Sequence, residues 1–179
     1  MAHPLAVNEI VNYGPGMLLK KPELASLIGC ICSDWSNVEL SIETFYSFLM
    51  GIYLPKNPGF EPPTHPVARQ VMDELVSIHA KINLLERLAS WVIKDEEQLK
   101  DAKQVLTKTR TSGKERNKVV HGIWGVCESE PDALILIPVF GNNMIYKKDD
   151  FEKILENIHK THAEIWRICN RFVQQRRQN

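Results

Sequence analysis

A run of apolar residues spaced three and four apart constrains the fold of this chain more than any other feature. The apolar positions are Leu24, Ile28, Ile31, Trp35, Val38, Ile42, Phe45 and Leu49. Because this spacing matches the 3.6-residue period of an α-helix, it predicts one long amphipathic helix over residues 22–51. Pro22 and Glu23 suit the first turn of that helix. A helix of this length with one apolar face must bury that face against other helices.

Three more segments are predicted to be helical. Apolar residues recur with the same period from Val67 to Ile93, after a loop that contains five prolines at residues 55–66. Asp95, Glu96 and Glu97 form the acidic first turn of a third helix, which continues to His121. Asp149 is a good N-cap for a last helix, whose apolar positions continue to Phe172.

The period changes to that of strands between the third and fourth of these helices. Ile123–Cys127 and Leu134–Phe140 predict a β-hairpin, and Met144–Tyr146 can add a short third strand. The expected fold class is therefore all-α, an antiparallel bundle of four main helices with a small β-hairpin inserted between the third and fourth helices. One domain is expected over residues 1–179, with residues 1–20 as a loose lead-in.

Charge and composition exclude several classes of protein. The 22 Lys and Arg balance 22 Asp and Glu, so any contact with nucleic acid must use a local basic patch. No apolar run has the length of a membrane span, and the N-terminus lacks a signal peptide, so we expect a cytoplasmic protein with no membrane partner. Glu156 and His159 lack the second Glu-x-x-His pair of a di-iron bundle, so no metal or cofactor is expected.

The stretch Glu-Arg-Asn-Lys-Val-Val-His-Gly-Ile-Trp-Gly at residues 115–125 contains the candidate catalytic residues Arg116, Asn117 and His121. On a helix, Asn117 and His121 lie on one face, and Arg116 lies about 140° round from His121. Histidine exchanges protons near neutral pH, arginine binds phosphate oxygens at any pH, and asparagine can orient either group. Together they can cleave RNA without a metal. His121 would remove the 2′-hydroxyl proton, and Arg116 would stabilise the charged phosphorane.

Basic residues near this stretch predict an RNA-binding stripe that tracks the phosphate backbone. They are Lys108, Arg110, Lys114 and Lys118. A purely structural interpretation stays open, in which Asn117 and His121 cap the end of the helix. In that case Arg116 pairs with an acidic residue of a neighbouring helix, such as Asp34 or Glu39.

The Arg-Asn-Lys-Val-Val-His-Gly motif resembles the signature of HEPN domains, in which an Arg followed by a polar residue precedes a His. The segment at residues 34–49 (DWSNVELSIETFYSFL) resembles an earlier helix of that family, in which a Trp and a Glu near the middle recur. The order of elements is also similar, from about residue 22 to 176. The resemblance implies a homodimer whose paired motifs form a metal-independent endoribonuclease cleft. Arg116 and His121 would be catalytic, and Asn117 would support them. It also implies an RNA substrate, a role as a toxin, in phage defence by abortive infection or in RNA processing, and a protein regulator such as an antitoxin.

Ile123 departs from one HEPN subgroup, in which a Tyr two residues after the His is modified by a partner nucleotidyltransferase. This departure argues against that toxin–antitoxin arrangement. Other HEPN members are inert, so the alternative function is a non-catalytic dimeric module that binds a nucleotide, RNA or protein partner. A helical bundle unrelated to this family is a third interpretation.

Overall fold

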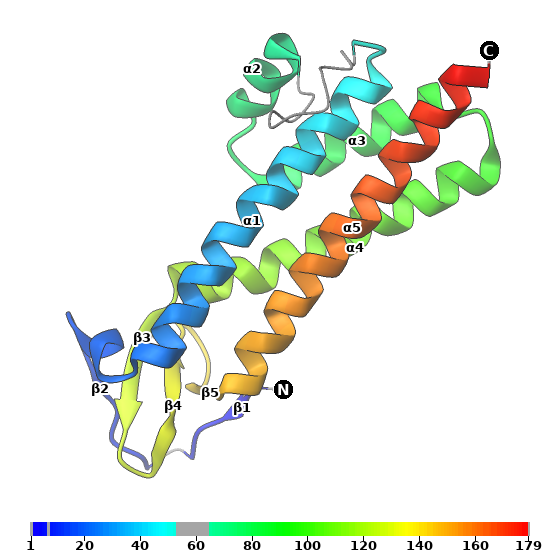
Figure 1. The fold of residues 1–179 in the computed structure, drawn as a ribbon. Coiled ribbons are helices and arrows are strands. Elements are labelled where there is room, and N and C mark those ends of the chain that lie inside the picture. The colour runs from blue at the N-terminus through cyan, green and yellow to red at the C-terminus, as the bar shows by residue number, and fades with distance from the viewer. Residues whose placement is uncertain (1, 7, 53–64, 179) are drawn as a thin grey trace. The chain divides into compact units, whose positions relative to one another are not determined.

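The computed structural model describes residues 2–6, 8–52 and 65–178. The fold is mostly helical with a small antiparallel sheet (Figure 1), which confirms the mainly-α class and matches the predicted four-helix bundle only in part. In chain order the elements are β1 (His3–Pro4), β2 (Asn12–Tyr13), the 3-10 helix η1 (Met17–Lys20), α1 (Pro22–Leu49), α2 (Pro66–Glu74), α3 (Ile78–Val92), α4 (Glu96–His121), β3 (Ile123–Cys127), β4 (Glu130–Ile137), β5 (Met144–Tyr146) and α5 (Lys148–Gln178). Among the described residues, no helix is both long enough and apolar enough to cross a membrane.

The chain forms two compact units. Unit 1 comprises residues 1–35 and 114–158, and unit 2 comprises residues 36–113 and 159–179. The helices α1, α4 and α5 each contribute to both units. The motif at residues 115–125 lies entirely in unit 1, so its geometry can be described within that unit.

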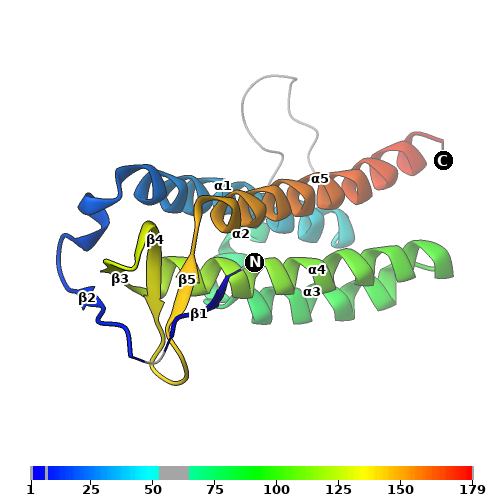
Figure 2. The same ribbon diagram turned by 90° about the horizontal axis from the view of Figure 1, so that it is seen from below.

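A five-stranded antiparallel sheet is the centre of unit 1. The order of the strands across the sheet is β1-β5-β4-β3-β2, which can be followed from right to left in Figure 2. The predicted hairpin and the predicted third strand are both present, and β5 pairs with β4. The expectation of a loose lead-in is wrong, because residues 3–4 and 12–13 form the two edge strands.

Burial on both faces of the sheet explains why the N-terminal segment pairs with it. Ala133 to Leu136 are all buried instead of alternating between buried and exposed. One face packs Ile135 against Leu5, with Val11 beside them. A lone hairpin is only marginally stable in water, and its edges carry unpaired backbone groups. The added strands bury the second face and pair those edges.

The limits of β4 differ from the predicted ones for local reasons. Cys127 lies opposite Glu130, so two residues make the hairpin turn and β4 starts four residues before Leu134. Pro138 follows the last residue of β4 and lacks the N–H that a ladder needs. Val139 and Phe140, which were expected in the strand, are exposed beyond its end.

Unit 2 is a cluster of helical segments around an aromatic and aliphatic core. The rings of Phe45 and Phe48 on α1 lie 6.0 Å and 6.4 Å from the ring of Phe172 on α5. Large side chains of α2, α3 and α4 are also fully buried, among them Met72, Ile82, Leu85 and Leu106. The burial of these positions confirms the apolar faces expected from the helical period.

The second predicted helix is two helices, α2 and α3. The backbone of Leu75 is extended, with φ −87° and ψ 90°. Two residues later the Ser77 hydroxyl accepts a hydrogen bond from the Ala80 N–H at 3.1 Å. A serine that caps a new helix competes with the continuation of the old one. Val76, between Leu75 and Ser77, is 97% exposed.

The starts of α4 and α5 show how carboxylates set a helix boundary. Asp95 accepts a hydrogen bond from the Gln98 N–H at 2.8 Å, as an N-cap does. At α5, the expected N-cap Asp149 is already inside the helix. Asp150 instead accepts from the Lys147 N–H at 3.0 Å, which is the reverse half of a capping box.

Candidate functional site

The last two turns of α4 carry all three predicted catalytic residues. Arg116 is half-buried, whereas Asn117 and His121 are exposed. Asn117 and His121 are four residues apart on a continuous helix, so their side chains stand one above the other on the same face. The predicted arrangement of these two residues on α4 is therefore present.

Arg116 turns toward this face of the helix. Its Nη1 donates a hydrogen bond to Asn117 Oδ1 at 3.0 Å. Its Nε is shielded from solvent and has no hydrogen-bond partner among the described residues. Because a guanidinium has five N–H donors in a planar fork, the bond to Asn117 leaves donors for an oxygen ligand. The pairing with Asp34 or Glu39 that the sequence left open stays a prediction.

His121 is the last residue of α4, where backbone carbonyls lack partners within the helix. One of these carbonyl oxygens accepts a hydrogen bond from a residue of the motif. Trp124 Nε1 donates a hydrogen bond to the carbonyl oxygen of Val119 at 2.9 Å, and both residues are buried. This bond links β3 to the last turn of α4. It therefore fixes the position of the backbone at His121, which lies between the two bonded residues.

Position 122 has no room for a side chain, so it requires glycine. A Cβ at this position would lie 2.2 Å from Leu136 Cδ1 and 2.6 Å from the Lys118 carbonyl oxygen. The φ of Gly122 is not positive, so the conformational freedom of glycine is not what this position requires. The glycine instead lets the chain turn from α4 into β3 directly against β4.

An aromatic cluster around Trp124 packs against the end of the motif. The ring of Trp124 lies 5.3 Å from that of Tyr146 in an edge-on arrangement and 5.5 Å from that of Phe151. Tyr146 and Phe151 are also 5.5 Å apart. Such offset and edge-on pairs contribute about 0.5–1.5 kcal/mol each beyond the area they bury. Trp124 is therefore a structural anchor that joins α4, β5 and the start of α5.

A surface ion pair lies beside this cluster. Lys118 Nζ is 2.8 Å from Glu115 Oε1, and this hydrogen bond raises the pKa of Lys118. Burial raises the pKa of the Tyr146 hydroxyl, and the charge of Glu115 raises that pKa further. At neutral pH Lys118 is therefore a cation and Tyr146 a neutral hydroxyl.

The predicted RNA-binding stripe is largely paired internally. Lys108 contacts Glu164 at 2.6 Å, and Arg110 contacts Glu86 at 3.0 Å. Lys118 is paired with Glu115. Lys114 is exposed, and no ion pair to it is found among the described residues. Three of the four predicted cations thus have carboxylate partners, and only Lys114 is left to meet phosphate without breaking a pair.

Other polar clusters of the described residues do not form a metal centre. No group of three or more His, Cys, Asp or Glu within residues 2–6, 8–52 and 65–178 is placed to hold a metal ion. Glu156 and His159 are both engaged in interactions of their own. On α5, burial lowers the pKa of His162.

No family model, curated protein or solved structure matches this chain. The resemblance to HEPN domains therefore stays a prediction. The structural role of Gly122 was missed at the sequence level, because the close approach of Leu136 depends on strand pairing. The hydrogen bond from Trp124 was also missed, although the position of Trp124 five residues after Val119, just past a helix end, was the available signal.

Proposed function

We propose that the chain is a metal-independent endoribonuclease whose active site contains Arg116, Asn117 and His121. The observation that carries this proposal is the hydrogen bond from Arg116 to Asn117 one helical turn before the exposed His121. A phosphate-binding group and a proton-transfer group then stand on one helix end. The rigid turn through Gly122 and the Trp124 anchor limit how far these groups can move.

The proposed reaction is an internal transfer at phosphorus. His121 accepts the proton of the ribose 2′-hydroxyl as the 2′-oxygen attacks the phosphorus. Arg116 stabilises the negative charge that builds on the non-bridging oxygens, and Asn117 holds the guanidinium in place. The bond from phosphorus to the 5′-oxygen breaks, and an imidazolium returns a proton to that oxygen. The products are a 2′,3′-cyclic phosphate and a 5′-hydroxyl.

A homodimer would complete this site. One imidazole cannot be base and acid at the same moment unless it delivers the proton it has just taken. Two copies related by a twofold axis would supply one His121 as base and the other as acid. This part of the proposal follows the HEPN resemblance and requires that the two motifs meet across the dimer interface.

The test is RNA cleavage in the presence of EDTA. Purified protein is incubated with a mixed RNA pool beside His121→Ala and Arg116→Ala, with His79→Ala as control because His79 is an exposed histidine of unit 2. Wild type and control should cleave, and both motif variants should lose at least a hundredfold in rate. Products with 3′-hydroxyl ends would refute this chemistry. A monomer by analytical ultracentrifugation would refute the shared site.

A non-catalytic module that binds RNA, a nucleotide or a protein is the second candidate. The observation that favours its protein-binding form is the charge of unit 1, which carries 8 Lys and Arg against 11 Asp and Glu. An acidic unit attracts a polyanion poorly at long range. RNA protection without cleavage in the same assay would select this function.

A further inference from the structure

Three neighbouring surface hollows of unit 2 share lining residues and extend from α5 to α4. The hollow on α5, of about 620 Å³, shares Arg171 with a smaller hollow between the two helices. That smaller hollow shares Lys100 and Gln104 with a third, of about 720 Å³, along α4. We call these three adjoining hollows together the α4–α5 groove. It lies within one compact unit, so its geometry does not depend on the rest of the chain.

An aromatic side chain lines the α5 end of the groove. Trp166 is half-buried, and its Nε1 donates a hydrogen bond to His162 Nε2 at 2.9 Å. The acceptor nitrogen must be unprotonated, and burial lowers the pKa of His162, so the bond is kept at neutral pH. The indole is thereby fixed by its edge, which leaves the ring as a flat apolar surface beside the groove.

Two arginines line the middle of the groove in fixed positions. Arg167 holds Asp101 through two bonds of 2.7 Å, and Arg171 Nη1 binds the same carboxylate at 2.7 Å. Two guanidinium groups thus share one carboxylate, which leaves one positive charge in excess. Both arginines are partly exposed, with 42% and 47% of their side-chain surface accessible, so their remaining donors can reach a ligand.

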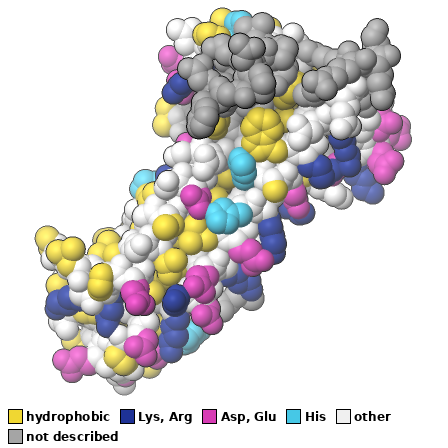
Figure 3. All heavy atoms as spheres, viewed as in Figure 1, with side chains coloured by type: hydrophobic (Ala, Val, Ile, Leu, Met, Phe, Trp, Pro, Cys, Tyr) yellow, Lys and Arg dark blue, Asp and Glu magenta, His cyan; other side chains and the backbone are white. Residues whose placement is uncertain are grey.

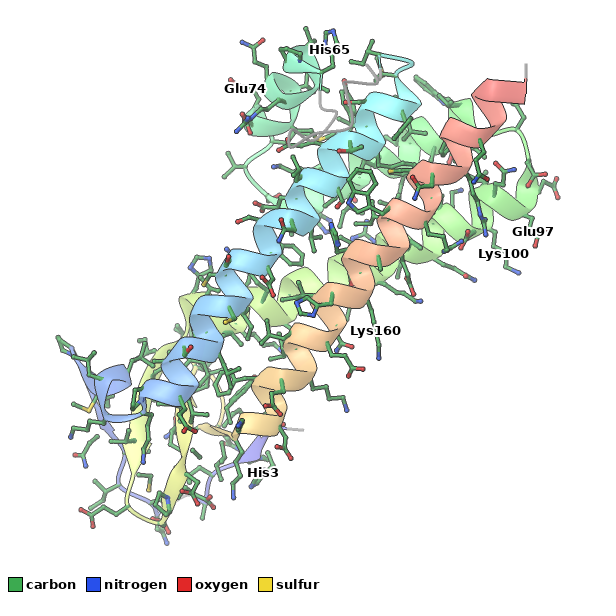
Figure 4. All side chains as sticks on the ribbon, in the orientation of Figure 1. His3, His65, Glu74, Glu97, Lys100 and Lys160 are labelled. Atoms are coloured by element: carbon green, nitrogen blue, oxygen red, sulfur yellow. The ribbon has the colours of Figure 1, made fainter. Side chains whose placement is uncertain are left out.

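Lysines continue the positive charge along α4. Lys100, Lys103 and Lys108 line the groove three and five residues apart, together with the carboxylates of Glu96, Glu97 and Asp101. All three lysines are exposed, and within the part of the chain that the structure describes only Lys108 has a carboxylate partner, Glu164. Figure 4 shows Lys100 beside Glu97 near the start of α4, and in Figure 3 Lys and Arg side chains are interleaved with Asp and Glu side chains.

Unit 2 as a whole is the basic part of the chain. It carries 14 Lys and Arg against 11 Asp and Glu, whereas unit 1 has the opposite balance. The zero net charge of the whole chain conceals this separation. A positively charged groove with a fixed aromatic ring at one end is the combination that binds single-stranded nucleic acid, through the phosphates and one stacked base.

We infer that the α4–α5 groove binds single-stranded RNA, with phosphates along Arg171, Lys100 and Lys103 and one base stacked on Trp166. The choice of RNA rests on the proposed ribonuclease function, and the groove would supply the affinity that the acidic unit 1 lacks. Base stacking on an aromatic side chain typically strengthens binding by about fivefold to 150-fold. A polyanion without bases, such as an acidic peptide, would gain nothing from Trp166.

The experiment measures binding separately from cleavage. A fluorescein-labelled single-stranded RNA is titrated in EDTA with the full chain carrying His121→Ala, and anisotropy is recorded at several salt concentrations. Lys100→Gln/Lys103→Gln is compared with Lys148→Gln/Lys153→Gln, which removes the same charge from exposed positions of α5 in unit 1. The groove variant should bind at least tenfold more weakly, and the slope of log K against log salt should fall by about 1.4. The control should stay within twofold of the parent.

A second comparison tests the stacking. Trp166→Ala should weaken binding at least fivefold, whereas Trp166→Phe, which keeps an aromatic ring, should retain most of the affinity. Circular dichroism and melting curves check that both variants fold. Equal binding by the groove variant and its control, or equal competition by polyglutamate and RNA, would overturn the inference.

The outcomes for the two proposals can be told apart. Cleavage by wild type together with unchanged RNA binding by the groove variants would leave the ribonuclease and remove the groove. Groove-dependent RNA binding by a protein that never cleaves would support the groove and remove the ribonuclease.

Discussion

Trp124 and Val119 are joined by a hydrogen bond of 2.9 Å from the indole Nε1 to the backbone carbonyl oxygen. Trp124 comes five residues after Val119, and between them lie His121 and the turn from helix to strand. The bond satisfies a carbonyl that the end of α4 would otherwise leave unpaired. Its effect is to connect the candidate active site to the aromatic cluster of unit 1.

Replacement of Trp124 by phenylalanine should therefore destabilise the protein. The ring is kept, but the buried Val119 carbonyl loses its donor, and we expect a loss of about 1–2 kcal/mol in the free energy of unfolding. Urea titration followed by circular dichroism measures it. Trp91→Phe is the matched control, since Trp91 is 76% exposed, and it should change stability by less than about 0.5 kcal/mol. Equal stabilities for the two variants would show that the Trp124 bond contributes nothing.

Gly122→Ala should be costly even though its backbone angles suit alanine. The added methyl group would overlap Leu136 Cδ1 and the Lys118 carbonyl oxygen, and such overpacking costs about 1–3 kcal/mol. The double variant Gly122→Ala/Leu136→Ala tests the cause. Gly122→Ala should cost less in the background of Leu136→Ala, because one of the two overlaps has gone. Strict additivity in a double-mutant cycle would rule out this contact.

Gly29→Ala should have the opposite sign. Gly29 is an exposed position within α1, and a Cβ there meets nothing within 4 Å. Alanine is favoured over glycine in a helix interior by about 1 kcal/mol, so the variant should raise the free energy of unfolding by roughly that amount. A rise in the midpoint of thermal unfolding checks it. A fall would mean that this part of α1 is not helical in solution.

Asp101→Asn should weaken unit 2, because Arg167 and Arg171 both bind this carboxylate. The hydrogen bond from Arg167 is the largest cause that lowers the pKa of Asp101. The stabilisation is therefore complete above the ordinary value near pH 4 and is lost as the pH falls through the lowered folded-state pKa. Since the arginines are partly exposed, the expected loss at pH 7 is about 1 kcal/mol. Urea titrations at pH 7 and pH 2 should show a difference between wild type and variant that shrinks at the lower pH.

His162 should make stability depend on pH in the range where histidine titrates. Burial lowers its pKa, and the neighbouring His159 lowers it further. The unfolded chain then binds a proton more readily than the folded one, so the stabilisation is complete above about pH 6.5 and is lost as the pH falls through the lowered folded-state pKa. His162→Gln should flatten the curve of unfolding free energy between pH 7.5 and pH 5. Parallel curves for the two proteins would exclude this contribution.

Several parts of the fold could be predicted from local sequence alone. The helices α1 and α4 follow from an apolar period that extends over many turns, where local and tertiary preferences agree. The paired placement of Asn117 and His121 follows from the same period. The strands β3 and β5 were predicted because β-branched and aromatic residues cluster between turn signals.

Other features depended on contacts between distant parts of the chain. The break between α2 and α3 rests on one serine cap within a continuous apolar pattern, and no period detects it. The strand pairing of the N-terminal segment needs β3 and β5 to be in place first, because two-residue strands have no stability alone. The partners of Lys108 and Arg110 lie on other helices, so a basic stripe in the sequence became a set of ion pairs in the structure.

The sequence by itself determined the long helices and the helix end that carries Arg116, Asn117 and His121, because short-range periodicity and turn chemistry specify both. Only the tertiary structure decided the five-stranded sheet, the tight contact at Gly122, and the hydrogen bond that anchors the motif through Trp124. It also decided that the α4–α5 groove is formed within the more basic unit. These features arise where segments far apart in the chain meet, and side-chain spacing along one segment holds no information about which partner it will meet.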